Sequence, residues 1–467
     1  MSDTLRNPRT TMTTDELTEP DTATPTKTAR RGSLRPLLLR LHFYLGVFVG
    51  PFLFVAALSG LLYIFTPQLE RAIYSHELTV PVGQAKQPLQ EQVDAAQRAL
   101  PDATFVRVRP GDADDASTQV IFSRADLAES HWLTAYVDPY TSEVRGTLET
   151  YGSSQAGPVR TWIDELHRGL HLGDFGRLYS ELAASWLWVV VLGGLILWWG
   201  RRRPAKGKGR RKLLSWHATT GTWVAIVLLF LSATGLTWSQ YASETVADIR
   251  SALSWETPTL PASVPLHGGH GEHQGGGQVT GTTVDQVLNI ARGSGLDGPV
   301  EIAVPSGSGK AYVVKQIQTG WPTKQDSVAV DPNTGEVLAK LKFDDFPLGA
   351  KLTRWGIDAH MGVLFGLVNQ LVLAAVCVSL LAMIVWGYRM WWHRRPTKDR
   401  FGFGRPFPRG AWRSLPKPVL VGLIVVTAVL AWYLPVLGVS LIGFLVIDAI
   451  IGRVRGGTSR ETSRTDA

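Results

Sequence analysis

Four stretches of the chain are almost free of charged residues and long enough to cross a membrane. A helix of about 20 apolar residues spans the hydrocarbon core of a bilayer. A fifth apolar stretch, residues 419–451, is interrupted at Tyr433, Leu434 and Pro435, and we expect it to close as a helical hairpin. The pattern predicts an all-α membrane bundle of four core helices followed by a C-terminal hairpin. The four core stretches are residues 41–65, 182–199, 216–238 and 367–392.

The long segments between the apolar stretches, residues 67–181 and 239–366, read as soluble sequence. Each opens with a helical pattern and continues with short runs of alternating residues that are typical of strands. The motifs VDPYTSEV at Val137 and VDPNTGEV at Val330 have the turn chemistry of a β-hairpin. We therefore expect two small α+β domains, each with one helix on an antiparallel sheet. The expected helices are 89–100 and 284–291, and the expected strands are 104–108, 119–122, 131–137, 300–304, 311–316 and 327–330.

The two halves of the chain resemble each other, which predicts an internal duplication. LHFYLGVFVGPFLFVAALSGLLY aligns with WHATTGTWVAIVLLFLSATGLTW at an offset of 175 residues (217−42). The W-x-x-x-x-H motif ending at His167 aligns with the one ending at His360, at an offset of 193 (360−167). The extra length of the second half corresponds to a His/Gly-rich insertion at 261–278. Because both halves begin and end on the same side, we expect a parallel repeat with its pseudo-symmetry axis along the membrane normal.

The formal charge of +8 is concentrated beside the apolar stretches, for example in RRRPAKGKGRRK at 201–212. Basic residues in short loops mark the cytoplasmic side of a membrane protein. We therefore expect both termini in the cytoplasm, the two long segments outside, and no nucleic-acid partner. No cleavable signal peptide is expected, because the first apolar run is long and lacks a small-residue cleavage site. The single cysteine, Cys377, excludes an intrachain disulfide and a cysteine-bound iron–sulfur centre.

These observations divide the chain into eleven segments. The segments are a disordered cytoplasmic tail (1–34), transmembrane helix 1 (35–66), the first outer domain (67–160), an interfacial segment with transmembrane helix 2 (161–200), a basic cytoplasmic loop (201–212), transmembrane helix 3 (213–240), the second outer domain (241–350), an interfacial segment with transmembrane helix 4 (351–393), a cytoplasmic loop (394–416), the transmembrane hairpin (417–452) and a cytoplasmic tail (453–467).

Four histidines at repeat-related positions are the strongest candidates for chemistry, because ionisable residues at membrane depth are costly. His42 and His217 lie near the cytoplasmic ends of the first and third helices, and His167 and His360 precede the second and fourth. A two-fold axis would bring His42 opposite His217, and His167 opposite His360. Two opposed imidazoles are the axial ligands that a bis-histidine haem needs, so we expect two haem b groups. The alternative for each histidine is an interhelical hydrogen bond or a place at the headgroup boundary.

Glycines near these histidines are expected to leave room for a porphyrin edge, although small residues also permit close helix packing. They are Gly46 and Gly221, four residues after a histidine, and Gly169, Gly173, Gly362 and Gly366.

Five further histidines are secondary candidates. His171 follows His167 by four residues. On a continuous helix both side chains would lie on one face, in a position to hold a metal between them. His393, among basic residues, is expected to contact headgroups. In the insertion, His267, His270 and His273 form a tract that either binds a transition metal loosely or is a flexible loop.

The sequence resembles the PepSY-associated transmembrane family over about residues 35–396. The resemblance rests on LHFYLGVFVG, ELHRGLHLGDFGR, SWHATTG, DAHMGVLFGLVNQL and GYRMWWHRRP, and the two outer domains resemble PepSY domains. It implies a bacterial inner-membrane protein tied to iron uptake, some of whose relatives are regarded as haem-containing ferric-siderophore reductases. His42, His167, His217 and His360 match the family's recurrent histidines, whereas His171, His393 and the insertion depart from its pattern.

The preferred hypothesis is a transmembrane electron carrier in the bacterial cytoplasmic membrane that reduces an outer ferric siderophore or other metal complex. Its electron donor would be a quinol or a cytoplasmic flavin reductase. Trp132, Tyr136, Trp321 and Lys324 are the candidates in the outer domains for contact with the complex, and no catalytic residue is assigned. The alternatives are a non-enzymatic, membrane-anchored PepSY regulator of peptidases, or a metal-binding accessory protein or permease.

Overall fold

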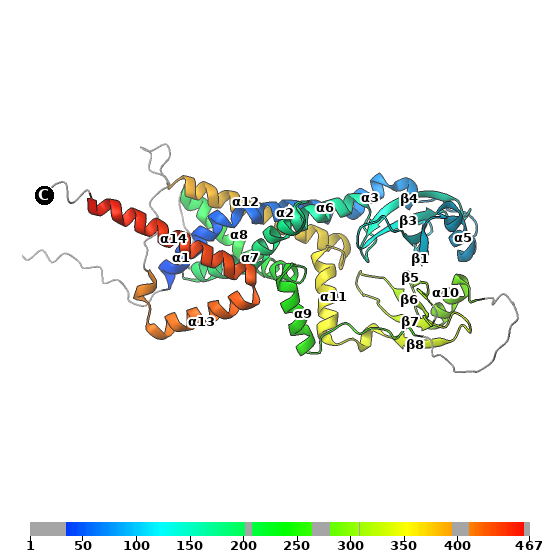
Figure 1. Ribbon diagram of the computed structural model, residues 1–467. Coiled ribbons are helices and arrows are strands. Elements are labelled where there is room, and N and C mark those ends of the chain that lie inside the picture. Colours follow the sequence, from blue (N-terminus) through cyan, green and yellow to red (C-terminus); the bar gives the residue numbers. More distant parts are fainter. Residues whose placement is uncertain (1–33, 201–207, 264–280, 308, 395–410, 462–467) are drawn as a thin grey trace, which may run out of the picture.

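The computed structural model describes residues 34–200, 208–263, 281–307, 309–394 and 411–461. Long helices pack side by side in one part of the molecule, and a single β-sheet lies beyond one end of them (Figure 1). We call this the sheet end of the helices, and the opposite end the far end.

Three helices in the described ranges are long and apolar enough to cross a membrane, and a bent pair makes a fourth candidate span. The bent pair, α1 (Arg35–Phe48) and α2 (Gly50–Ile64), turns by 56° at Val49. The expected span over 41–65 is therefore made of two helices that meet at a bend. The straight spans are α7 (Gly173–Trp199), α8 (Arg210–Leu236) and α12 (Gly366–Trp392). Helix α7 begins nine residues before the expected start at 182.

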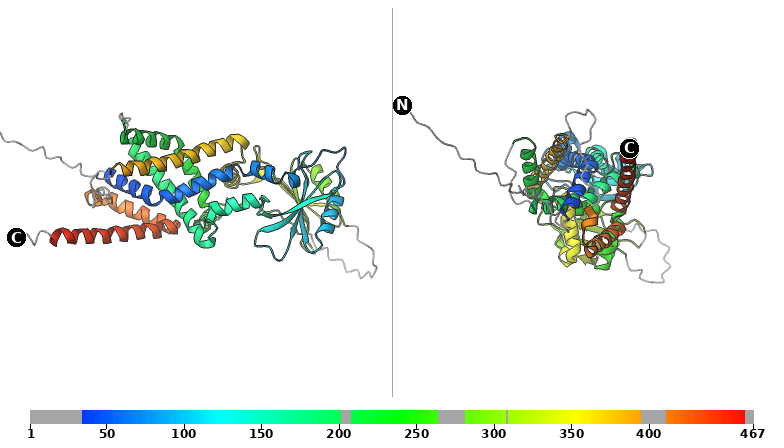
Figure 2. Two further views of the ribbon diagram at one scale, coloured as in Figure 1. Left: turned by 90° about the horizontal axis from the view of Figure 1, so that it is seen from above. Right: turned by 90° about the vertical axis from the view of Figure 1, so that its left-hand side faces the viewer.

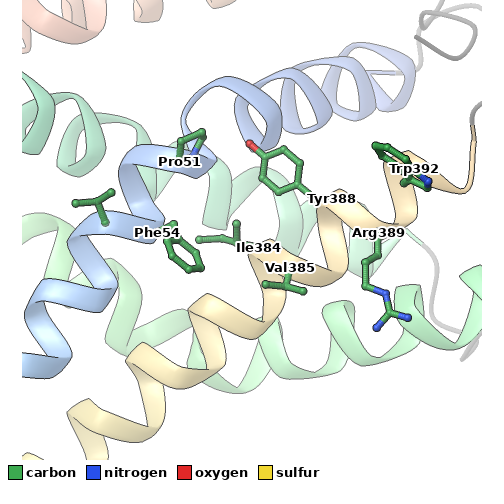
Figure 3. Close-up of a pocket in the computed structure, with 8 residues that line it drawn as sticks. Pro51, Phe54, Ile384, Val385, Tyr388, Arg389 and Trp392 are labelled. Atoms are coloured by element: carbon green, nitrogen blue, oxygen red, sulfur yellow. The ribbon is translucent and has the colours of Figure 1, made fainter. Parts of the chain in front are cut away.

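The bend has a local cause in Pro51. Proline has no backbone N–H, so the Val47 carbonyl four residues earlier loses its helical hydrogen bond. The Tyr388 hydroxyl of α12 donates to that carbonyl at 2.7 Å, and in Figure 3 its oxygen points toward the start of α2. The residue 175 positions after Pro51 (226−51) is Ile226, and α8 runs unbroken through it.

The eight strands of the described ranges form one antiparallel sheet in the order β4-β3-β2-β1-β5-β6-β7-β8. The two expected outer domains are thus joined edge to edge, because β1 pairs with β5 through Arg107 to Ala303 and Val108 to Ile302. Separate sheets were expected, since a sequence pattern says nothing about pairing between distant strands. The strands are β1 (Thr104–Arg109), β2 (Thr118–Ser123), β3 (His131–Val137), β4 (Val144–Tyr151), β5 (Val300–Ala303), β6 (Tyr312–Gln316), β7 (Ser327–Val330) and β8 (Val337–Leu341).

Two helices, α5 (Leu89–Ala99) and α10 (Val284–Gly293), cover the face of the sheet that is turned away from the membrane helices (Figures 1 and 2). Their apolar residues share one continuous core with alternate residues of the strands. Burial of such side chains is the main driving force for this part of the fold. The opposite face, which we call the open face, is turned toward the membrane helices.

Short helices connect the sheet to the membrane helices. Helix α9, which the sequence pattern did not predict, begins where the fully buried Glu181 of α7 accepts hydrogen bonds from the N–H groups of Tyr241 and Ala242 at 2.9 and 3.1 Å. A carboxylate is a favourable partner for the unpaired N–H groups of a helix N-terminus. The connectors are α3 (Thr66–Ile73), α4 (Ser75–Leu78), α6 (Pro158–Gly169), α9 (Ala242–Ala252), the 3-10 turn Phe343–Asp345 and α11 (Leu348–His360).

The C-terminal apolar region forms two helices, α13 (Lys417–Tyr433) and α14 (Pro435–Glu461), that meet at Leu434 as the sequence predicts. A 3-10 turn, Ala411–Ser414, precedes them. Helix α14 packs on α7, where the Trp186 indole donates to Ser440 at 2.9 Å. It also contacts α1 through a 2.6 Å ion pair between Arg40 and Asp448. The hairpin therefore packs against the first half of the chain.

Candidate functional site

The structure brings His42 and His217 together at the far end of the membrane helices. His42 lies on α1 and His217 on α8, and their ring centroids are 6.2 Å apart with an angle of 83° between the planes. His42 Nδ1 lies 3.1 Å from the Val190 carbonyl of α7, and His217 Nδ1 lies 3.1 Å from the Met383 carbonyl of α12. A carbonyl only accepts, so both rings must carry their proton on Nδ1. Their Nε2 atoms therefore keep a free lone pair.

The second pair lies at the sheet end. His167 is near the end of α6 and His360 is the last residue of α11, and the two rings are close enough that a charge on one would affect the other. His167 Nδ1 lies 2.9 Å from the Ser59 hydroxyl of α2, and His360 Nδ1 lies 2.6 Å from the Thr234 hydroxyl of α8.

The hydroxyl hydrogen bonds determine the tautomer of this second pair as well. Ser59 donates to the Val55 carbonyl of its own helix at 2.8 Å, and Thr234 donates to the Phe230 carbonyl at 2.8 Å. A hydroxyl has one proton to donate, so each accepts from the histidine Nδ1–H. The lone pair on Nε2 is again left free in both rings.

All four histidines thus have the arrangement that metal-binding histidines require. A ligating imidazole uses one nitrogen for the metal, and the other donates to a carbonyl or other acceptor that orients the ring. Metal–imidazole bonds of about 2.0–2.1 Å place the centroids of two opposed rings about 6 Å apart. The separation of 6.2 Å between His42 and His217 fits a metal held between them. This chemistry is available without further protein ligands, as in a bis-histidine haem.

The partners of the histidines also occupy related positions in the two halves. Val190 and Met383 are 193 residues apart (383−190), the same offset as His167 and His360. Ser59 and Thr234 are 175 apart (234−59), the same offset as His42 and His217. These hydrogen-bond partners were not predicted from the sequence. A hydroxyl followed by glycine in both aligned helices, SG at Ser59 and TG at Thr234, was the available signal.

Glycines make room for two of the imidazole rings, although they are not those that the sequence analysis singled out. A Cβ atom on Gly194 would lie 3.2 Å from Cε1 of His42, and one on Gly60 would lie 3.3 Å from Cε1 of His167. These contacts are tighter than ordinary packing, so a larger residue would displace the ring. Beside His42 there is a cavity of about 140 Å³ that is also lined by Leu38 and Trp188.

The glycines that were expected to border a porphyrin have mixed surroundings. A Cβ on Gly46 would meet open space, whereas one on Gly221 would touch the Met383 side chain at 3.4 Å. A Cβ on Gly169 would touch Arg177 at 3.6 Å. The other three serve the backbone, because glycine adopts positive φ at little cost. They are Gly173 (φ 57°), Gly362 (φ 79°) and Gly366 (φ 56°).

His171 does not share a helix face with His167, so that expectation was wrong. Helix α6 ends at Gly169, and Leu170 and His171 both adopt left-handed backbone conformations. His171 instead contacts Glu165 at 3.1 Å and packs on Trp162 with ring centroids 4.9 Å apart. His393 is exposed at the end of α12. His267, His270 and His273 lie outside the described residues, and within the described ranges no three His, Cys, Asp or Glu side chains form a metal-binding group.

The candidates for contact with an outer metal complex are not all exposed. Tyr136 is buried, with 2% of its surface accessible, so its side chain is not placed to contact an outer complex. Trp132 is half-buried beneath Arg107. Trp321 is exposed but packs on Trp355 of α11. The Lys324 backbone N–H donates to the Gln318 carbonyl at 3.1 Å in the same loop.

An open groove of about 560 Å³ runs between α2 and α12 toward the far end (Figure 3). Its walls are mostly apolar, and none of the four histidines lines it. An apolar, open groove on helices of this kind is a surface that lipid chains can cover.

Comparison with known families identifies the family of the chain. The family described as the PepSY-associated TM region matches residues 39–394, well over half of the chain. The chain belongs to the PepSY-associated transmembrane family. No curated protein matches its sequence. Membership in this family, together with the apolar helices, identifies a multi-pass membrane protein whose surroundings are a lipid bilayer.

Proposed function

We propose that this member of the PepSY-associated transmembrane family is a haem-containing electron carrier of the bacterial cytoplasmic membrane that reduces a ferric complex, such as a ferric siderophore. The observation that supports the proposal most strongly is the common state of the four histidines. Each has its Nδ1 bonded to an acceptor at a repeat-related position, and each has an unshared Nε2. A protein that only anchored or regulated a peptidase would have no need of two such pairs.

In this proposal the chain is an internal duplication, and each half supplies one ligand to each of two haem b groups. His42 and His217 would hold the group at the far end, and His167 and His360 the group at the sheet end. A bound haem iron supplies one-electron chemistry at a potential set by its ligands and surroundings. Hydrogen bonds at Nδ1 orient the rings, and the apolar helices keep water away from them.

The direction of transfer follows from the proposed topology. The basic segments adjoin the far end, so this end would face the cytoplasm, with both termini there. A quinol or a cytoplasmic flavin reductase would deliver electrons at the far end. The sheet end would face a ferric complex outside. Hard oxygen ligands prefer Fe(III) to Fe(II), so reduction would weaken the hold of a siderophore on its metal.

The first test is the visible spectrum of the purified protein, oxidised and reduced with dithionite, with a pyridine haemochrome assay. We expect sharp low-spin bands and about two haems per chain. His42→Ala and His360→Ala should each remove one haem and leave the other. His171→Ala and His393→Ala are matched controls that should keep both, because these side chains lie apart from the pairs.

A protein that stays colourless after haem supplementation during expression would contradict the proposal. It would then favour the alternative of a membrane-anchored PepSY regulator of peptidases or a metal-binding accessory protein. If haem is present but a control variant loses it, the ligand assignment is wrong while the electron-carrier proposal stands.

A further inference from the structure

The open face of the sheet carries a basic cluster where the two halves of the sheet join. Arg107 and Arg109 of β1 lie on this face, because the intervening Val108 is fully buried in the core on the other face. Lys315 of β6 belongs to the same face, since it pairs with Glu301 of β5, which contacts both arginines. Strand residues two apart point to the same side of a sheet. The cluster thus combines residues from both halves of the chain.

Among the ion pairs of the described residues, the two arginines share one carboxylate. Glu301 is the carboxylate nearest to both arginines, at 2.6 Å from Arg109 and 3.9 Å from Arg107. Arg354 of α11 also faces Lys315, but its own charge is paired with the buried Asp358. Desolvation beside the sheet, with the charges of Arg354 and Arg109, lowers the pKa of Lys315, and Glu301 opposes this shift in part. A local excess of positive charge of this kind attracts anions.

Arg107 is the member of the cluster whose hydrogen bonds are least satisfied. Arg109 donates to Glu301 and to the Ser153 carbonyl, at 2.8 and 2.6 Å. In contrast, Nε and Nη2 of Arg107 are buried and have no hydrogen-bond partner among the described residues, while the side chain as a whole keeps 19% of its surface accessible. The guanidinium carbon lies 4.1 Å from the centre of the Trp132 ring. A buried donor without a partner costs free energy, and in a native protein it calls for an explanation.

The two unpartnered atoms, Nε and Nη2, form one edge of the guanidinium fork. Their parallel N–H bonds match the two oxygens of a carboxylate, which arginine binds in a bidentate manner. Stacking on Trp132 holds the fork in one plane and reduces the entropy lost on binding. Gln119 on the same face adds a second buried atom without a partner, its Oε1, which accepts hydrogen bonds.

We propose that this cluster is a binding site for a carboxylate-bearing metal chelate, with the Nε and Nη2 edge of Arg107 holding one carboxylate. Lys315 and Arg109 supply the remaining positive charge. The proposal rests on the proposed function, because the chelate would be the electron acceptor.

The place of the cluster suits an acceptor. Arg354, which faces Lys315, is on α11, and six residues later the same helix ends at His360. At 1.5 Å per residue the two lie about 9 Å apart along the helix axis. Trp355 and Trp321 pack together beside this helix, with ring centroids 5.5 Å apart. A chelate on the cluster would therefore be held near the sheet-end histidine pair.

Calorimetric titration of the full-length protein in detergent with gallium(III) citrate tests the site. Gallium(III) is not reduced under these conditions, so binding is measured apart from electron transfer. We expect saturable binding that Arg107→Gln weakens by at least about tenfold, and that Arg107→Lys, which keeps the charge but not the fork, weakens by about tenfold. Arg124→Gln is the matched control. It removes the same charge from an exposed residue paired with Asp126, and should change affinity by less than about twofold.

The outcomes separate this inference from the proposed function. Absence of saturable binding, wild-type affinity in Arg107→Lys, or an equal loss in Arg124→Gln would overturn the carboxylate site. Equal binding of citrate alone would support carboxylate recognition without a need for the metal.

His360→Ala should bind gallium citrate as the wild type does. A colourless protein that binds gallium citrate through Arg107 would refute the haem proposal and leave the site standing. If Arg107→Gln does not fold, as judged by its elution and thermal unfolding, Arg107→Lys decides.

Discussion

The two helices that cover the sheet, α5 and α10, occupy corresponding places but begin in different ways. α10 begins with its own capping box, in which Thr283 and Gln286 satisfy each other's backbone N–H groups. α5 begins after Pro88 and has no cap from its own segment. Its first N–H groups, those of Leu89 and Gln90, donate to the two carboxylate oxygens of Asp285 in α10, at 2.7 and 2.9 Å.

The start of α5 therefore depends on the second half for its cap, while α10 receives one bond in return, from the Val284 N–H to Oε1 of Gln90 at 3.3 Å. The Asp285 carboxylate crosses from one half to the other at the helices, and the pairing of β1 with β5 does so in the sheet. A single carboxylate at the start of α5 also complements the positive end of the helix dipole. Two units with the same order of elements therefore share one sheet and one core.

The membrane helices differ in a similar way. The first half is bent at Pro51 and uses Tyr388 of the other half to satisfy the freed carbonyl. The second half, with Ile226 in place of proline, needs no such partner. The histidine pairs, in contrast, keep equivalent partners in both halves. The two halves are therefore alike in their histidines and in the partners of those histidines. They differ at the bend and at the helix caps, where one half supplies hydrogen bonds to the other.

The largest expected effect tests whether the halves contribute equally to the site. His42→Ala and His217→Ala should give the same spectrum, with the haem content reduced by half in each. Pyridine haemochrome assays of the two variants, with His76→Ala as a control on the exposed surface, measure this. Loss of haem in one variant only would show that the two halves are not equivalent at the far end.

The next effect concerns the hydroxyl partners at the sheet end. Ser59→Ala and Thr234→Val should each weaken retention of the sheet-end haem by about 10- to 100-fold, because the ring loses the acceptor that orients it. Titration of the haem-depleted protein with haem measures the affinity. Thr222→Val removes a hydroxyl on α8 that bonds only to its own helix, and should leave the affinity unchanged. A similar loss in this control would mean that helix packing is responsible.

The caps of the two covering helices should differ in their contribution to stability. Asp285→Ala should destabilise the protein by about 2 kcal/mol, since two N–H groups of α5 and one helix dipole lose their partner. Thr283→Ala should cost about 1 kcal/mol, a single cap. Thermal unfolding in detergent gives the order of the two shifts. A larger shift for Thr283→Ala would contradict the dependence of α5 on the other half.

The smallest expected effect is at the bend. Tyr388→Phe should destabilise the protein by about 1 kcal/mol, because the Val47 carbonyl loses its hydrogen bond. In a Pro51→Ala background the carbonyl regains a helical donor, so the same change should cost less. A double-mutant cycle of thermal unfolding measures this coupling. Equal effects in both backgrounds would show that Tyr388 acts through packing alone.

Much of the secondary structure is local, and the sequence predicted it well. The strand 131–137 and the break at Leu434 occur where the pattern placed them, since alternation and proline act over a few residues. The bend at Val49 was also signalled by Pro51, yet the run from 41 to 65 reads as one apolar stretch. Hydropathy reports how apolar a segment is and not the direction of its helix axis, so it did not reveal the bend.

Part of the candidate site was likewise predictable from the sequence, and part of it was not. Repeat-related spacing alone singled out His42, His167, His217 and His360. The sequence also indicated which of them should be neighbours, given a two-fold axis. It could not predict the acceptors at Val190, Met383, Ser59 and Thr234, because these depend on the rotation of one helix against another. His171 was misjudged because the end of α6 was not apparent from its pattern.

The membrane helices, most of the strands, the family and the histidines that are candidates for a metal can be predicted without the structure. These follow from periodicity and spacing, which are properties of short segments and of their repetition. The packing of distant segments was needed to show which nitrogen of each histidine is free, that two domains share one sheet, and that one edge of Arg107 has no partner among the described residues. Hydrogen bonds and burial between distant segments depend on how the segments pack in three dimensions, and a one-dimensional pattern does not contain that information.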